Sequence, residues 1–175
     1  MNRLLLRIAL IVVVAGGIVG YRILFVDTDE VIGFNDTVVD VVEKADAGFH
    51  PFVAELEKYS EGGSVDVEML TQIRDSLESN LTRNRNRLQS VEIPEDEICQ
   101  GFHAACVAYV DNSMTIAEKY KEVIEYISAH NPGDKENSDA VDELLDDLIT
   151  KDQELLQAIG QHQEKMAKEF DIKLE

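Results

Sequence analysis

The sequence predicts an all-α fold: an antiparallel up-down-up-down four-helix bundle preceded by one N-terminal transmembrane helix. Three observations support this prediction. Residues 4–26 form one long apolar stretch, and four later segments repeat apolar residues at intervals of three and four, which is typical of amphipathic helices. After Asp27, no segment shows the bounded alternation of apolar and polar residues that a half-buried strand requires. Short connections between long amphipathic helices favour antiparallel neighbours, and this gives the bundle topology.

The N-terminal apolar stretch is long enough to anchor the chain in a membrane. A helix that crosses a bilayer needs about 20 apolar residues, and residues 4–26 supply them. Arg3 and Arg7 lie at its start, whereas the acidic Asp27 follows its end. Basic residues next to a span stay in the cytoplasm. We therefore expect a cytoplasmic N-terminus and an extracytoplasmic C-terminal domain, which would be periplasmic in a Gram-negative cell.

A cleaved signal peptide is the alternative interpretation of this stretch. Ala15 and Gly17 have the small-x-small spacing of a cleavage site, but apolar residues continue beyond them to Val26. Arg22 lies near one end of the stretch, so its head group can extend to the membrane interface. We favour an uncleaved signal-anchor helix over residues 1–26, a linker over residues 27–34, and an extracytoplasmic four-helix bundle over residues 35–175.

The net charge restricts the partners of the outer domain. Beyond residue 26 there are 13 basic residues against 35 acidic ones, a net charge of −22. Nucleic-acid binding needs clustered Lys and Arg for the phosphates, so this charge argues against it. It also argues against lying on an anionic lipid surface. The acidic surface is typical of a soluble domain whose self-repulsion is screened by salt.

Three arginines form the one basic cluster of the outer domain. Arg83, Arg85 and Arg87 alternate with asparagines. On a helix Arg83 and Arg87 share a face, and Arg85 points elsewhere. We interpret the cluster as a solvated surface whose cations pair with nearby acids, with a local anion or partner contact as the alternative.

The first two bundle helices are predicted over residues 35–59 and over the segment after Ser64. Pro51 lies inside the first of them, so we expect a kink over residues 47–50. The glycines at 62 and 63 end this helix. The predicted buried stripes are Val38, Val42, Ala45, Phe49, Phe52, Leu56 and Tyr59 in the first helix, and Leu70, Ile73, Leu77, Leu81, Asn84, Leu88 and Val91 in the second.

The last two helices are punctuated by a proline, an Asn-Pro-Gly turn and a serine. Pro94 suits the first turn of the third helix, which ends at residues 131–133. Ser138 is the expected N-cap of the fourth helix. The predicted stripes are Ile98, Phe102, Cys106, Tyr109, Ser113, Ile116, Tyr120, Ile124 and Ile127 in the third helix, and Val141, Leu145, Leu148, Leu155, Ile159, His162, Met166 and Phe170 in the fourth.

Polar residues interrupt the apolar faces at Asn84, Asp152 and His162. Burial without a hydrogen-bond partner costs about 1–3 kcal/mol for each such group. Two structural explanations are open. The side chains pair with one another or with trapped water, or they lie at the edge of the stripe and reach solvent.

Cys99, His103 and Cys106 form the sharpest candidate site, because their spacing places all three on one helical face. The two cysteines are seven residues apart, about 10.5 Å along a helix, so they cannot bridge each other. They are therefore buried core residues, partners of another chain, or ligands. The last alternative is a copper or zinc site of Cys99, His103 and Cys106 with His162, and with Met166 at a similar height. No Cys-x-x-Cys or haem-attachment motif accompanies them.

The sequence predicts a membrane-anchored interaction or sensing module without catalytic activity, with a metal- or small-ligand-binding bundle around Cys99, His103 and Cys106 as the alternative. No nucleophile elbow, phosphate-binding glycine loop or di-iron motif is present, so we expect no enzyme and no cofactor. We expect a protein partner and no nucleic acid. The architecture is similar to the extracytoplasmic four-helix sensor modules of bacterial receptors, and this likeness concerns the fold alone.

Overall fold

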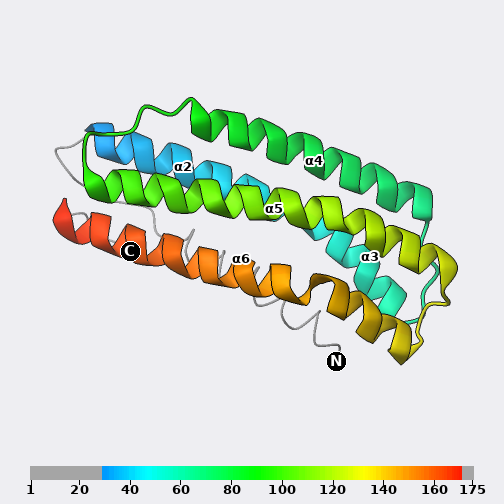
Figure 1. The fold of residues 1–175 in the computed structure, drawn as a ribbon. Coiled ribbons are helices and arrows are strands. Elements are labelled where there is room, and N and C mark those ends of the chain that lie inside the picture. The colour runs from blue at the N-terminus through cyan, green and yellow to red at the C-terminus, as the bar shows by residue number, and fades with distance from the viewer. Residues whose placement is uncertain (1–28, 171–175) are drawn as a thin grey trace.

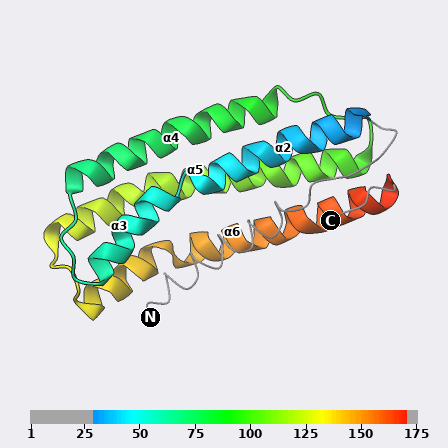
Figure 2. The same ribbon diagram turned by 180° about the vertical axis from the view of Figure 1, so that it is seen from behind.

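Five helical segments follow one another along residues 29–170, the part of the chain that this computed structural model describes. They are α2 (Asp29–Ala47), α3 (His50–Ser60), α4 (Val67–Gln89), α5 (Glu97–Ala129) and α6 (Lys135–Glu169). Figures 1 and 2 show α4, α5 and α6 running alternately up and down, with α2 and α3 together forming the fourth rod. Residues 29–170 contain no strand, and the predicted all-helical class is confirmed.

The predicted transmembrane helix over residues 1–26 lies outside the described residues. Within residues 29–170, no helix combines the length and the apolar character that a membrane span requires. Helix α2 begins at Asp29, six residues before the expected start at Asn35, so most of the predicted linker is helical. The reason is that Val31 and Phe34, both buried, extend the apolar stripe of this helix toward the N-terminus.

The predicted kink over residues 47–50 is confirmed, and it is a complete break between α2 and α3. Pro51 lies in the first turn of α3, where its missing N–H leaves no hydrogen bond unmade. The backbone N–H of Gly48 donates to the Ala45 carbonyl, and that of Phe49 to the Asp46 carbonyl. A Cβ atom at Gly48 would lie 2.8 Å from the Cδ1 atom of Leu77, so glycine lets the end of α2 approach α4 closely.

Aspartates begin the three long helices, so the expected positions of Pro94 and Ser138 at two of the helix starts were wrong. Asp66, Asp96 and Asp134 are the N-caps of α4, α5 and α6, and each accepts hydrogen bonds from backbone N–H groups of the first turn. Pro94 lies two residues before the cap of α5 and not in its first turn. Ser138 lies buried inside α6, because Asp134 already caps that helix.

The core is formed by the predicted stripes of α2 to α5 and by a stripe on α6 that matches the prediction at Val141, Leu145, Ile159 and Met166 but not between them. All but the terminal or edge positions of the earlier stripes are buried. On α6, however, Leu148, Leu155 and His162 are half-buried, whereas Ile149, Leu156 and Gln163 are buried. The stacked rings of Phe52 and Tyr120, with centroids 3.7 Å apart, join α3 to α5.

Candidate functional site

The break between α2 and α3 leaves a groove against α4, which we call the α4 groove. Beyond the break, α3 slants away from α4 toward the far side of the bundle (Figures 1 and 2). The groove has a volume of about 560 Å³, within the usual range for small-molecule sites. The twelve lining residues are Lys44, Ala47, Gly48, Pro51, Met69, Gln72, Ile73, Ser76, Leu77, Asn80, Arg83 and Asn84.

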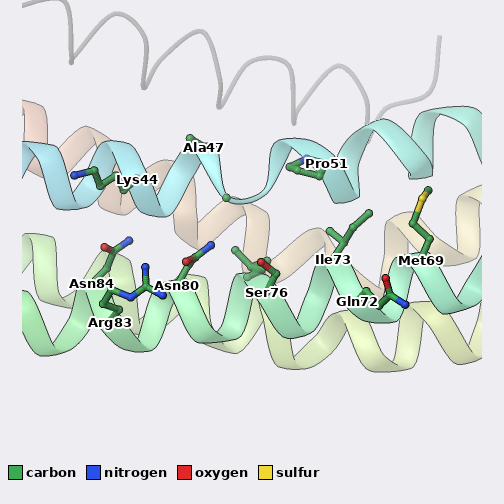
Figure 3. Close-up of a pocket in the computed structure, with 12 residues that line it drawn as sticks. Lys44, Ala47, Pro51, Met69, Gln72, Ile73, Ser76, Asn80, Arg83 and Asn84 are labelled. Atoms are coloured by element: carbon green, nitrogen blue, oxygen red, sulfur yellow. The ribbon is translucent and has the colours of Figure 1, made fainter.

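One end of the α4 groove is cationic and amide-rich. Figure 3 shows Lys44 on α2 opposite Asn80, Arg83 and Asn84 on α4. The Lys44 Nζ atom lies 2.8 Å from a carboxylate oxygen of Asp40, which also pairs with Arg87. Arg83, in contrast, forms no ion pair with any residue of the described chain. The positive charge of Arg83 is therefore available to a bound molecule.

The other end of the α4 groove is apolar. Pro51 at the start of α3 faces Ile73 and Met69 on α4 (Figure 3). The Met69 side chain is 37% exposed, and Met69 and Val67 are the two exposed large hydrophobic residues of the described chain. The groove therefore runs from a cationic end to an apolar end along one face of α4.

Asn84 contributes an amide to the groove. Its side chain is only 7% exposed, and it makes no hydrogen bond with any described residue. Figure 3 shows Asn84 projecting from α4 toward α2. Asn84 interrupts the leucine stripe of α4. Neither predicted pairing partner, Asp152 or His162, contacts it, and the amide lines the groove instead.

A second polar group, the central polar cluster, lies inside the bundle and consists of Asp46, Tyr109, Asn112, Ser113 and Asp152. Tyr109, Asn112, Ser113 and Asp152 are almost fully buried, whereas the Asp46 side chain is 12% exposed and lies 3.8 Å from the Nε2 atom of the exposed His50. The Tyr109 hydroxyl donates to Asp46 over 3.5 Å, and the Asn112 amide donates to the Asp152 carboxylate over 3.2 Å. The same Asn112 amide group donates to the Leu148 carbonyl over 3.3 Å.

Burial controls the titration of this cluster. It raises the pKa of Asp152 to about 7, an effect that the Asn112 hydrogen bond opposes and the nearby Asp46 charge reinforces. Burial also raises the pKa of Asp46, against the influence of His50 and of the Tyr109 hydroxyl. None of the five residues lines the α4 groove. The cluster is therefore a polar part of the core that reaches the surface at Asp46, beside His50.

The predicted metal ligands lie at the end of the bundle where α5 begins, and the structure brings some of them close. Cys99 and Cys106 are both fully buried and both reduced. The Cys99 Sγ atom lies 3.9 Å from the Met166 Sδ atom of α6. A Cβ atom at Gly101 would lie 2.8 Å from the His162 ring, so His162 packs directly on α5 at Gly101. The His162 Nδ1 atom is buried and has no hydrogen-bond partner among the described residues.

His103 faces away from these groups. Its Nε2 atom lies 2.9 Å from the Leu88 carbonyl of α4, and its ring lies beside Phe34 of α2. Within residues 29–170, no three side chains of His, Cys, Asp or Glu converge in a way that could hold a metal ion. Burial raises the pKa of both thiols and lowers that of His162. The metal site of Cys99, His103, Cys106 and His162 stays a prediction.

Of the three clustered arginines, two pair with nearby acids as predicted. The third leaves open the alternative of an anion or partner contact. Arg85 pairs with Asp111 of α5 over 2.5 Å, and Arg87 pairs with Asp40 of α2. Arg83 faces the α4 groove. Comparison of the chain with protein-family models, with curated proteins and with solved structures finds no match.

Proposed function

We propose that this protein is a non-catalytic, membrane-anchored sensing module whose helical domain binds a small ligand in the α4 groove. The observation that carries the proposal is the lining of the groove, which joins the unpaired Arg83 and the unpartnered Asn84 amide at one end to Ile73 and Met69 at the other. Asn84 makes no hydrogen bond with any described residue, and its amide atoms are open to water in the groove. A ligand that hydrogen-bonds there replaces this water.

The placement of the reactive groups supports a binding role without chemistry. Asp46 and Asp152, two carboxylates whose pKa values are raised, lie in the central polar cluster and not in the groove. The thiols of Cys99 and Cys106 are fully buried, and burial raises their pKa values, which disfavours the nucleophilic thiolate. The groove itself offers amides, a hydroxyl and two cations.

The membrane and a partner protein complete this proposal. Residues 1–26 hold the domain at the outer face of a membrane, and a partner protein reads the liganded state. The broken rod supports such a readout, because α2 and α3 are separate helices that meet at the groove and a ligand contacts both sides of the break. A ligand shifts a conformational equilibrium by its difference in affinity for the two conformations. A ligand that contacts both α2 and α3 can therefore change how these two helices are arranged.

A thermal-shift screen of the full-length protein in lipid nanodiscs tests the function. The library contains amino acids, sugars, amines and organic acids. A ligand at about 100 times its Kd stabilises the folded state by about 2.7 kcal/mol, which raises the Tm of a domain of this size by about 5–10 °C. Each hit is recovered and analysed for chemical change.

Two tryptophan variants make the screen specific for the groove. Ser76→Trp fills the groove from an exposed lining position, whereas Thr82→Trp places the same indole on an exposed part of α4 outside it. We expect a hit that stabilises the wild type and Thr82→Trp but not Ser76→Trp, and that is recovered unchanged. A library without such a hit, or a hit that the protein converts into a product, contradicts the proposal.

A further inference from the structure

The charged residues that line the α4 groove indicate the charge of its ligand. One residue in five of the chain is acidic, 35 of 175, yet none of the twelve lining residues is Asp or Glu. Two of the twelve, Lys44 and Arg83, are basic, although basic residues number only 16 in the whole chain. The groove is therefore a cation-lined strip on a strongly acidic molecule, and it attracts anions that the remaining surface repels.

We propose that the α4 groove binds amphipathic monocarboxylates, with the carboxylate at Arg83 and the apolar chain against Ile73 and Met69. This inference rests on the proposed binding function and specifies its ligand. It follows from the order of the groups along α4. Arg83 and Asn84 lie at one end, Asn80 and Ser76 follow, and Ile73 and Met69 lie at the other end (Figure 3).

The available charge favours a monoanion. Lys44 is already paired with Asp40, so the lining holds one cation without a partner among the described residues, the Arg83 guanidinium. A guanidinium binds a carboxylate through two parallel hydrogen bonds. Asn84, 7% exposed, adds an unpartnered amide at the next position of the chain, and Asn80 lies one turn away. Together these groups can donate hydrogen bonds to both oxygens of one carboxylate.

The apolar end sets the second requirement. Met69 is one of the two exposed large hydrophobic residues of the described chain, and Pro51 and Ile73 lie beside it. A methionine is flexible and adapts to an unbranched chain. The burial of each methylene group corresponds to roughly fourfold tighter binding. A molecule with a carboxylate alone leaves this end of the groove unfilled.

Titration calorimetry on the full-length protein in lipid nanodiscs tests the inference, with protein-free nanodiscs as the blank. The probes are octanoate, hexanoate and octylamine. We expect octanoate to bind at one site, hexanoate to bind roughly 15-fold more weakly because it lacks two methylenes, and octylamine not to bind above the blank. Octylamine that binds as well as octanoate, or equal affinities for the two acids, overturns the proposal.

Three variants assign the binding to the groove. Arg83→Gln should weaken octanoate binding roughly 10- to 100-fold, because a charge-assisted pair is lost. Asn84→Leu should also weaken it while raising the Tm, since leucine continues the apolar stripe, so unfolding cannot explain the loss. Arg85→Gln is the matched control, because Arg85 pairs with Asp111 and does not line the groove. Unchanged binding in Arg83→Gln contradicts the assignment.

Two outcomes distinguish a failure of the carboxylate inference from a failure of the proposed binding function. If octanoate does not bind but another compound class stabilises the wild type and not Ser76→Trp, the carboxylate inference is wrong and the binding function stands. If no compound class distinguishes Ser76→Trp from Thr82→Trp, both are wrong.

Discussion

Replacing Asp152 by asparagine should change how the stability of the domain depends on pH. Asp152 is 4% exposed, and burial raises its pKa from 3.8 to about 7. Between these two values the unfolded chain has lost the Asp152 proton and the folded domain retains it. The folded state then binds more protons than the unfolded state, so the free energy of unfolding decreases as the pH rises from about 4 to about 7. Above about 7 both states are ionised and this contribution becomes constant.

The size of the effect follows from the shift of the pKa. A shift of about three pH units corresponds to about 4 kcal/mol, lost at up to about 1.4 kcal/mol per pH unit. Asparagine has no proton to lose, so its folded domain avoids this cost. The additional N–H group of the introduced side-chain amide needs a partner and costs about 1–3 kcal/mol without one. We therefore expect Asp152→Asn to be more stable than the wild type by about 1–3 kcal/mol at pH 8, and no more stable at pH 4.

Urea denaturation of the full-length protein in nanodiscs, followed by far-UV circular dichroism over pH 4–8, measures this difference. Asp147→Asn is the matched control, because Asp147 is exposed on the same helix. Its unfolding free energy should follow the wild type at every pH within about 0.5 kcal/mol. A difference between Asp152→Asn and the wild type that does not change with pH, or that favours the wild type at pH 8, would refute the reasoning.

Three further outcomes are expected. Leu156→Ala should lower the free energy of unfolding by about 2–5 kcal/mol, because Leu156 is fully buried. Leu155→Ala should lower it less, because Leu155 is half-buried, and urea denaturation measures both. A thiol reagent should label Cys99 and Cys106 only in denaturant, since both side chains are fully buried. Labelling of the native protein, detected by mass spectrometry, would contradict this. The protein should stay in the membrane fraction after a carbonate wash if residues 1–26 are retained as an anchor, and release into the supernatant would contradict that.

The helices of the bundle could be predicted from the sequence because their apolar residues keep the helical period over many turns. In α5 the stripe from Phe102 to Ile127 is buried as expected. The proline break was predictable for a local reason, since Pro51 can form a first turn but not continue a helix. The helix starts were less certain, because Asp134 and Ser138 are both good caps and sequence alone does not rank them.

The buried face of α6 could be predicted only in part. Leu148 and Ile149 are adjacent, as are Leu155 and Leu156, so two stripes of similar apolarity compete. Asp152, which interrupts the predicted apolar face, is buried with Ile149 and Leu156. Its burial is stabilised by Asn112, which lies 40 residues earlier on α5. A partner so distant in the sequence leaves no local signal in α6.

Asn84 and Asp152, two of the three polar residues that interrupt the predicted stripes, require different explanations. Asp152 has a hydrogen-bond partner inside the bundle, so the fold itself accounts for it. Asn84 is buried to a similar degree and has no partner among the described residues, although leucine at this position would continue the stripe of Leu77, Leu81 and Leu88. The amide atoms of Asn84 are open to water in the α4 groove. The ligand that we propose for this groove would supply the contact that the fold itself does not.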